Sequence, residues 1–255
     1  MSKPKIRLVH HLARTGGTLI SRCLGTMSSV ALFSEVNPRG GYKITEQAWK
    51  WFNLISEFEY KSIDLSLQGN FIEAVSLIEK RCKDRNLNPV LRDWTHLDYM
   101  GVPYGQPTYR LSMAESLQGR FDVIQIATVR HPVDQYLSLS KLPGMEGNLT
   151  LELFVKGYLE FARRAVKMPL FRYEDFLQNQ MEMMSDICGR LEVDFDDSFQ
   201  LTWPDYTKIT GDNVKNSGTQ VRKKKRQHDP TLLEQMSSIE GYDEALELLG
   251  YRHPG

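Results

Sequence analysis

Residues 6–20 read Ile-Arg-Leu-Val-His-His-Leu-Ala-Arg-Thr-Gly-Gly-Thr-Leu-Ile, and this stretch decides the class of fold. A short β-rich run at residues 6–10 passes through small residues into an apolar pattern that is typical of a helix after Gly17. A strand that leads through a glycine-containing loop into a helix is the opening of a βα unit. The segment therefore predicts an α/β protein.

Short β-rich runs alternate with helical patterns along the rest of the chain, which predicts parallel strands joined by helices. The run at residues 123–129 is apolar almost throughout, as expected of a strand covered on both faces. The other expected strands are residues 29–33, 89–93 and 168–171. Helical spacing recurs over residues 49–58, 71–82, 173–191 and 232–236, and in a last stretch that closes at Leu249. We expect a single α/β domain over residues 1–255, with a mostly parallel central sheet flanked by helices.

Composition and charge narrow the classes of function. Lys plus Arg total 32 and Asp plus Glu total 32, so the basic face of a nucleic-acid binder is not expected. No apolar run approaches the roughly twenty residues of a membrane span, and no signal-like apolar segment precedes residue 6. Cys23, Cys82 and Cys188 are few and widely separated, which favours small buried residues over a disulfide framework or a zinc site. We expect a cytoplasmic protein with no nucleic-acid partner and no membrane span.

The loop at residues 12–18 has the composition of an anion-binding site, and we call it the phosphate loop. Gly16 and Gly17 allow the backbone to approach an anion closely, and the start of a helix presents unpaired N–H groups. Thr15 and Thr18 add hydroxyl donors, and Arg14 adds a positive charge. The loop of ATP and GTP hydrolases requires a lysine directly before its Ser or Thr, whereas Gly17 directly precedes Thr18 here. An ordinary nucleoside triphosphatase is therefore disfavoured, and a tight turn without a ligand is the structural alternative.

A second candidate for phosphate binding follows the apolar run at residues 123–129. Arg130 ends this strand, Pro132 is a typical first residue of a helix, and Ser138 lies eight positions after Arg130. An arginine at the carboxyl end of a strand can pair with a phosphate dianion. A salt bridge from Arg130 to Asp134 at the helix start is the structural alternative.

Together these segments resemble the sulfotransferase family. That family holds the 5′-phosphosulfate of its donor with a Lys/Arg-Ser/Thr-Gly-x-Thr loop, which residues 14–18 match. It holds the 3′-phosphate with an arginine and a serine at the spacing of Arg130 and Ser138. A third match, Tyr173-Glu174-Asp175, is similar to an element whose tyrosine sits near the adenine, although acidic residues also favour helix starts for structural reasons alone.

The resemblance spans most of the chain, from residue 6 to residue 251, and implies a P-loop-like fold. It also implies transfer of a sulfuryl group from 3′-phosphoadenosine 5′-phosphosulfate (PAPS) to a hydroxyl or amine, by in-line displacement with a general base. The residues that it assigns to the donor are Arg14, Thr15, Gly16, Gly17, Thr18, Leu19, Arg130, Ser138 and Tyr173.

The candidate base follows the expected strand at residues 89–93. In many sulfotransferases this strand ends in Lys-Thr/Ser-His-Leu, with histidine as the catalytic base, and His96 stands in the matching position. Trp94 replaces the usual lysine, so the lysine's charge-stabilising role passes to Arg14. Asp93 is the rival base, because a desolvated carboxylate can do the same work. A packed structural histidine is the alternative for His96, and the resemblance gives His10 and His11 no role.

The segment at residues 205–230 is the longest irregular region that we expect, and long loops of compact domains are often functional. The resemblance implies that the Gly211-Asp212 element and the basic run at residues 222–226 fold over the nucleotide. A solvated charge run is the alternative for the basic residues.

Three classes of function remain open from the sequence. The leading hypothesis is an active sulfotransferase with PAPS as co-substrate, no metal, and a small-molecule, carbohydrate or peptide acceptor. A metal-dependent nucleotide kinase or related phosphotransferase is the alternative enzyme. A nucleotide-binding module without catalysis is the alternative outside enzymes, and Trp94 is the residue that favours it.

Overall fold

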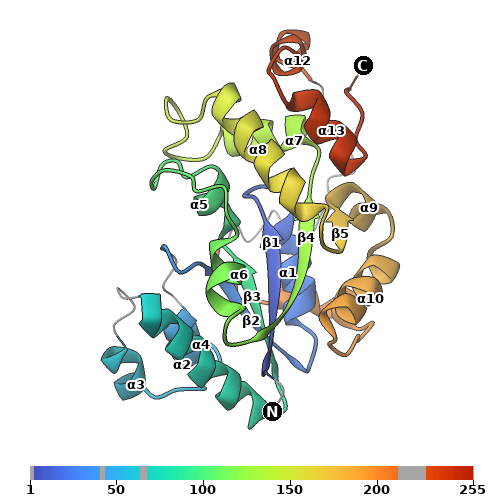
Figure 1. The fold of residues 1–255 in the computed structure, drawn as a ribbon. Coiled ribbons are helices and arrows are strands. Elements are labelled where there is room, and N and C mark those ends of the chain that lie inside the picture. Colours follow the sequence, from blue (N-terminus) through green and yellow to red (C-terminus); the bar gives the residue numbers. More distant parts are fainter. Residues whose placement is uncertain (1–2, 41–43, 64–67, 212–227, 255) are drawn as a thin grey trace.

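A parallel five-stranded sheet forms the centre of the molecule (Figure 1). The computed structural model describes residues 3–40, 44–63, 68–211 and 228–254. The strands lie in the order β2-β3-β1-β4-β5, and every neighbouring pair is parallel. Their bounds are β1 (Lys5–His11), β2 (Val30–Val36), β3 (Asn88–Asp93), β4 (Asp122–Val129) and β5 (Leu170–Arg172). The strands predicted from the sequence are confirmed within three residues at each end.

Helices account for most of the remaining described chain. They are α1 (Gly17–Gly25), α2 (Ile44–Lys50), α3 (Glu57–Ser62), α4 (Gln68–Lys83), α5 (Thr95–Tyr99), α6 (Ser112–Leu117), α7 (Pro132–Leu139), α8 (Leu151–Ala165), α9 (Tyr173–Gln178), α10 (Gln180–Leu191), α11 (Phe199–Thr202), α12 (Pro230–Ser237) and α13 (Tyr242–Leu249), with a short 3-10 helix η1 (Trp203–Asp205). Within the described residues, none of the helices combines the length and the apolar character of a membrane span.

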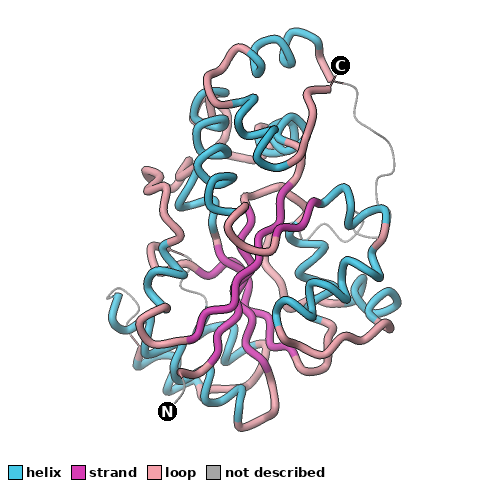
Figure 2. The backbone as a smooth tube through the Cα atoms, turned by 45° about the vertical axis from the view of Figure 1, so that its right-hand side comes forward, coloured by secondary structure: helices cyan, strands magenta, loops and turns pink. Residues whose placement is uncertain are grey.

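The helices cover both faces of the sheet (Figures 1 and 2). Side chains alternate along β1, so that Ile6 and Leu8 join one apolar cluster while Val9 joins another. The first cluster includes residues of α4, α8 and α13, and the second includes residues of α1 and α10. Neighbouring residues of β4 divide in the same way, with Ile126 in the second cluster and Ala127 in the first. Burial on both faces explains why the sequence of this strand is almost continuously apolar.

The strand order reverses at β1, which lies between β3 and β4. Val9 pairs with Arg92 of β3, and His11 pairs with Thr128 of β4. The chain leaves β1 toward β2 and β3 and crosses to β4 only afterwards. In open parallel sheets, ligands bind beyond the carboxyl ends of the strands at such a point. The segments that follow β1, β3 and β4 therefore share the edge where a ligand is expected.

Two of the helical predictions are wrong in detail, and one helix was not predicted. The helix expected over residues 49–58 is broken into α2 and α3, because Asn53 has a φ of 50° and Ser56 starts α3 with a capping box. The helix expected over residues 173–191 is divided into α9 and α10 at Asn179, whose side chain caps α10. Helix α8 is missing from the predictions, although Phe154, Tyr158 and other buried residues recur at helical spacing along it.

The cysteines are buried free thiols, as predicted. Burial raises the pKa of Cys23 to about 12, so this thiol is inert. Of the irregular region expected at residues 205–230, residues 205–211 and 228–230 are described.

Candidate active site

The phosphate loop connects β1 to α1, and two glycines determine its shape. Gly16 is the N-cap of α1 and has a left-handed φ of 85°. A Cβ on Gly16 would lie 2.1 Å from Cδ2 of Tyr173, and a Cβ on Gly17 would lie 2.3 Å from Cδ2 of His11. Neither position therefore has room for a side chain. The glycines allow the loop to pack against the Tyr173 and His11 rings, a reason for glycine that the sequence does not show.

The N-terminus of α1 presents donors to an anion. The first N–H groups of a helix have no partner within it, and among the described residues no side chain caps this end. Thr15 uses its hydroxyl inside the loop, where it donates to the carbonyl of Leu12 at 2.9 Å. The Thr18 oxygen accepts a hydrogen bond from Arg92 at 3.1 Å. The loop thus offers backbone N–H groups and the hydroxyl proton of Thr18 to a bound phosphate.

Arg14, Ser138 and Arg130 meet beside the phosphate loop. Arg14 has a φ of 69°, and its Nε donates to Oγ of Ser138 at 2.9 Å. Nη1 of Arg130 donates to the Arg14 carbonyl at 3.4 Å, and the Arg130 guanidinium lies 5.2 Å from the centre of the Tyr173 ring. Nε of Arg130 is buried and has no hydrogen-bond partner among the described residues. The structure therefore brings together the three segments that the sequence predicts for the donor, with a buried donor group that an anion would satisfy.

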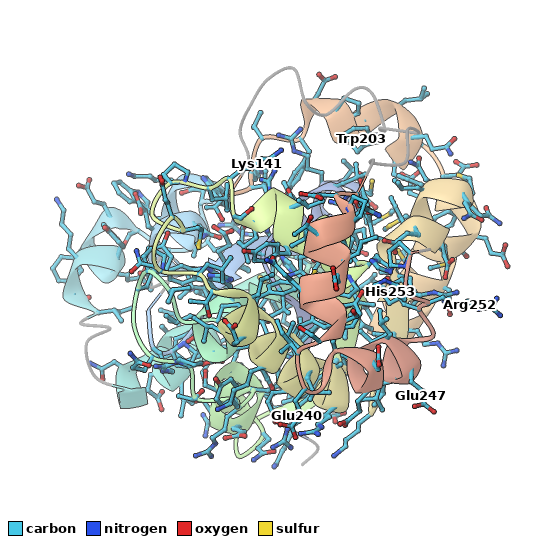
Figure 3. The ribbon with its side chains drawn as sticks, turned by 90° about the horizontal axis from the view of Figure 1, so that it is seen from above. Lys141, Trp203, Glu240, Glu247, Arg252 and His253 are labelled. Atoms are coloured by element: carbon cyan, nitrogen blue, oxygen red, sulfur yellow. The ribbon has the colours of Figure 1, made fainter. Side chains whose placement is uncertain are left out.

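The C-terminal segment supports this part of the site. Glu174 accepts a hydrogen bond from the backbone N–H of His131 at 2.9 Å and another from the hydroxyl of Tyr251 at 2.7 Å. Nε2 of His131 donates to the carbonyl of Arg252, which lies beyond α13 (Figure 3), at 2.9 Å. The chain after α13 is thus tied to the ends of β4 and β5.

His96 carries an unpaired nitrogen in a buried position on α5. A carbonyl only accepts, so Nε2 carries the proton that is donated to the carbonyl of Val102 at 2.8 Å. Nδ1 therefore holds a lone pair, and it is buried with no hydrogen-bond partner among the described residues. Burial lowers the pKa of His96, against the opposing effects of the Val102 carbonyl and the Glu35 carboxylate. A neutral histidine with a free lone pair is the form that a general base requires.

Asp93, the rival base, has both carboxylate oxygens engaged. Oδ2 lies 2.7 Å from Nδ1 of His10 in a fully buried pair, and Oδ1 accepts from Nδ2 of Asn37 at 3.2 Å. Each oxygen of Asp93 therefore already has a buried neighbour, whereas Nδ1 of His96 has none among the described residues. The geometry therefore favours His96 over Asp93 as the base.

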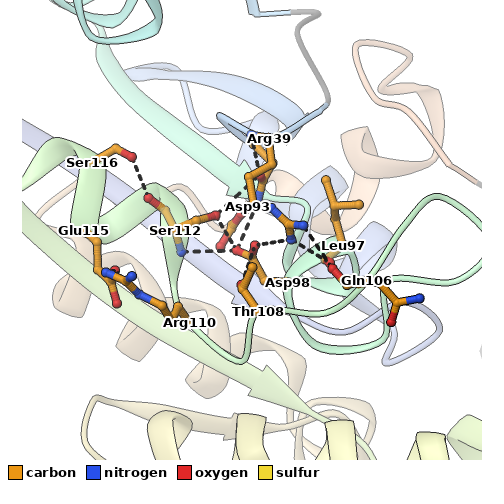
Figure 4. Close-up of polar contacts among 11 residues, drawn as sticks. Arg39, Asp93, Leu97, Asp98, Gln106, Thr108, Arg110, Ser112, Glu115 and Ser116 are labelled. Carbon is orange, nitrogen blue, oxygen red and sulfur yellow. Dashed lines mark hydrogen bonds and ion pairs between the residues drawn. The ribbon is translucent and has the colours of Figure 1, made fainter. Parts of the chain in front are cut away.

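A polar network holds the helix that carries His96 (Figure 4). Asp98 of α5 accepts hydrogen bonds from the Ser112 hydroxyl at 2.6 Å and from Nη1 of Arg39 at 3.1 Å. Asn37 donates through Nδ2 to both Asp98 and Asp93, at 3.2 Å each. Burial, together with the nearby Asp93 carboxylate, raises the pKa of Asp98. The network ties α5 to β3, to α6 and to the segment after β2, and so sets the position of His96.

Arg92 is a buried cation at the end of β3 for which the sequence predicts no role. Arg92 donates four hydrogen bonds, to Nε2 of His11 (2.9 Å), Oγ of Ser34 (2.9 Å), the Thr210 carbonyl (3.0 Å) and Oγ1 of Thr18 (3.1 Å). A carboxylate oxygen of Glu35 lies 3.6 Å from Nη2 of Arg92. Because Arg92 donates to His11, that ring is neutral, and burial followed by the Arg92 charge lowers the pKa of His11 well below its ordinary value. The signal in the sequence is an arginine directly after the buried pair Val90-Leu91, at the edge of the sheet where ligands bind.

Trp94 presents a ring rather than a charge at the start of α5. Its ring centre lies 4.9 Å from that of Tyr104, in an edge-on contact. Tyr104 is 62% exposed, so the aromatic pair reaches the surface of the molecule near His96.

The segment expected to close over the nucleotide is described only at its start. The hydroxyls of Thr210 and Ser34 lie 2.8 Å apart, and a Cβ on Gly211 would lie 3.3 Å from Oγ1 of Thr18. The start of the segment therefore reaches the phosphate loop. Asp212 and the basic run at residues 222–226 lie outside the described residues.

Comparison with solved structures places this chain in a known fold. The sulfotransferase domain from the curacin biosynthetic pathway superposes with a TM-score of 0.60 at 15% identity, covering 100% of this chain and 99% of that chain. The sulfotransferase domain from the Synechococcus PCC 7002 olefin synthase superposes with a TM-score of 0.59 at 14% identity, covering 100% of this chain and 98% of that chain. No family model and no curated protein matches the sequence.

The sheet, its helices and the loop after β1 define an α/β protein of the P-loop-like class. Within that class the chain has the sulfotransferase fold, as the sequence predicts.

Proposed function

We propose that this chain is a sulfotransferase that moves a sulfuryl group from PAPS to a hydroxyl or amine of an acceptor. The observation that carries the proposal is the meeting of three features at one edge of the sheet. They are the start of α1, the buried Nε of Arg130 and the buried Nδ1 of His96, none of which has a side-chain partner among the described residues. The first two features suit two phosphates, and the third suits a proton acceptor.

The residues present fit a nucleotide with phosphates on both its 5′ and 3′ oxygens. The phosphate loop would hold the 5′-phosphate through its backbone N–H groups and Thr18, and Arg130 would hold the 3′-phosphate with Ser138. The Tyr173 ring lies against Gly16, and its centre is 5.2 Å from the Arg130 guanidinium.

PAPS supplies a sulfuryl group that is activated by its bond to a phosphate. Nδ1 of His96 takes the proton of the acceptor hydroxyl or amine as the new bond to sulfur forms. The bond between sulfur and the bridging oxygen breaks, and its electron pair stays on the 5′-phosphate. The N–H groups of α1 and the Thr18 hydroxyl stabilise the charge that develops there. The Val102 carbonyl, 2.8 Å from Nε2, continues to accept its hydrogen bond and favours the protonated ring.

A screen with PAPS labelled in the sulfuryl group tests this function. Small molecules, carbohydrates and peptides with free hydroxyls or amines are offered as acceptors, and formation of labelled product and of adenosine 3′,5′-bisphosphate is measured. We expect transfer to at least one acceptor class, and loss of that transfer in His96→Ala. Binding of the bisphosphate without transfer to any acceptor would favour a binding module. Turnover of a nucleoside triphosphate that requires magnesium would favour a phosphotransferase.

A further inference from the structure

The buried guanidinium of Arg92 is joined to the phosphate loop through one hydroxyl. Arg92 is 4% exposed, and its Nη2 donates to Oγ1 of Thr18 in the first turn of α1. Burial lowers the pKa of Arg92, but an arginine remains protonated in proteins, so a full positive charge lies beside this hydroxyl. The other N–H groups of Arg92 are directed at β1, β2 and the Thr210 carbonyl, which fixes the guanidinium in place.

The Thr18 hydroxyl is left with its own proton to donate. It accepts from Arg92, and within the described part of the chain it donates to no other residue. A hydroxyl that accepts from a charged group becomes a stronger donor, because hydrogen bonds in series polarise one another. Thr18 stands in the first turn of α1, where helix N-termini bind anions, so its O–H is available to an anion held there.

Arg92 lies on the side of the phosphate loop where the candidate base lies. Nε of Arg14 is bonded to Ser138 of α7, which follows β4 on the opposite side of β1 from β3. Arg92 belongs to β3, and α5 with His96 follows that strand directly. Glu35 of β2 lies on the same side, with a carboxylate oxygen 3.6 Å from Nη2 of Arg92.

We infer that Arg92 is a positioning residue that acts through Thr18 to stabilise the 5′-phosphate as it becomes the leaving group. This inference rests on the proposed function. Trp94 stands where many sulfotransferases have a charge-stabilising lysine, and a tryptophan ring cannot supply that charge. Arg92 and Thr18 would supply it instead. As the sulfur–oxygen bond breaks and its electrons pass to the phosphate, the Thr18 O–H donates to that oxygen and keeps its proton. The acceptor proton goes to His96 as before.

Calorimetry with two nucleotides tests the inference without requiring turnover. Adenosine 3′,5′-bisphosphate carries the 5′-phosphate and adenosine 3′-monophosphate lacks it, so the ratio of their affinities measures the contribution of the 5′-phosphate. We expect Arg92→Lys and Thr18→Val each to reduce this ratio about tenfold. The affinity ratio of the double variant should fall no further than that of either single variant, because Arg92 and Thr18 act through one hydrogen bond. Thr18→Ser, which restores a hydroxyl, should restore the ratio.

Arg7→Lys is the matched control, since Arg7 is also a buried arginine of the sheet. It donates to the carbonyls of Leu191 and Glu192 at the opposite end of β1, so its replacement should lower stability and leave the ratio unchanged. The inference would be overturned if Arg92→Lys lost the same factor of affinity for both nucleotides. It would also be overturned if the two single-variant reductions of the affinity ratio added up in the double variant.

A second variant keeps the test informative if Arg92→Lys does not fold. Glu35→Gln removes the carboxylate that partly neutralises Arg92, and it should raise the ratio when Thr18 is present. In a Thr18→Val background, Glu35→Gln should raise the affinity ratio little or not at all. An equal rise of the ratio with and without Thr18 would refute the role of Thr18. A wild-type chain that binds the bisphosphate but transfers nothing would refute the proposed function alone, while one that binds neither nucleotide would overturn both.

Discussion

His96 and Asp93 lie three positions apart, yet their surroundings give them different chemistry. Asp93 is held between His10 and Asn37, and both of its oxygens are engaged. His96 has one nitrogen bonded to Val102, and the other has no hydrogen-bond partner in the described part of the chain. The nitrogen without a partner is the one that can accept a proton during transfer.

We therefore expect His96→Ala to lower kcat by about 10²–10⁴, the usual contribution of a general base. Affinity for the bisphosphate, measured by calorimetry, should stay close to that of the wild type, because the proposed role of His96 is toward the acceptor and not toward the nucleotide. Near-normal turnover of His96→Ala would eliminate it as the base.

Asp93→Asn is the parallel measurement. It disturbs a fully buried hydrogen bond with His10, and leaving a buried polar group unsatisfied typically costs about 1–3 kcal/mol of stability. We expect Asp93→Asn mainly to lower the free energy of unfolding measured in urea. Its loss of kcat should be smaller than that of His96→Ala. A folded Asp93→Asn protein with the larger loss of kcat would transfer the role of base to the carboxylate.

At the scale of elements, the end of β4 and the start of α7 form the proposed 3′-phosphate site. Arg130→Ala should reduce affinity for adenosine 3′,5′-bisphosphate about 10- to 150-fold, because a charge-assisted hydrogen bond is lost. Affinity for AMP, which has no 3′-phosphate, should change much less. Arg172→Ala is the control, since Arg172 ends the next strand and pairs with Asp175 at 2.8 Å. Equal affinity of the wild type for the two nucleotides would refute the 3′-phosphate site.

The packing of α8 against α5 depends on one glycine. A Cβ on Gly157 would lie 2.3 Å from the carbonyl oxygen of Tyr99, so Gly157→Ala must separate α8 from the helix that carries His96. We expect a loss of about 1–3 kcal/mol in unfolding free energy and lower turnover. Gly189→Ala, in α10, has nothing within 4 Å of the new Cβ and should instead stabilise the protein by about 0.5–1 kcal/mol. Equal effects of the two substitutions would contradict this view of the α8–α5 contact.

At the scale of the whole molecule, buried neutral histidines link stability to pH. Burial lowers the pKa of both His11 and His96, whereas the unfolded chain titrates them near about 6.5. Below that pH the unfolded state binds more protons than the folded state, so stability falls as the solution becomes more acidic. Each such histidine contributes a slope of up to about 1.4 kcal/mol per pH unit.

Urea unfolding between about pH 7 and pH 5 measures this slope. His11→Gln removes one titrating group while keeping an acceptor for Arg92, so its stability should fall less steeply than that of the wild type. Identical slopes for the two proteins would show that His11 is protonated in the folded state.

The local sequence was sufficient to predict the strands and the phosphate loop. Their signals, the apolar run of β4 and the residues around Gly16 and Gly17, lie within a few positions of one another. Local signals also predicted that a strand ends near Arg130 and that a helix starts at Pro132, and β4 and α7 confirm both. The break between α2 and α3 depends on a single positive φ at Asn53, which apolar periodicity does not reveal.

Only the tertiary structure decided which side chains meet at the edge of the sheet. The pairing of His10 with Asp93, the contact of Arg92 with Thr18 and the packing of Tyr173 on Gly16 join residues from different strands and helices. Periodicity reports which face of an element is buried, but it does not report which partner covers that face. The parallel register of β1 with β3 and β4 brings these residues together, and that register is a property of the whole sheet.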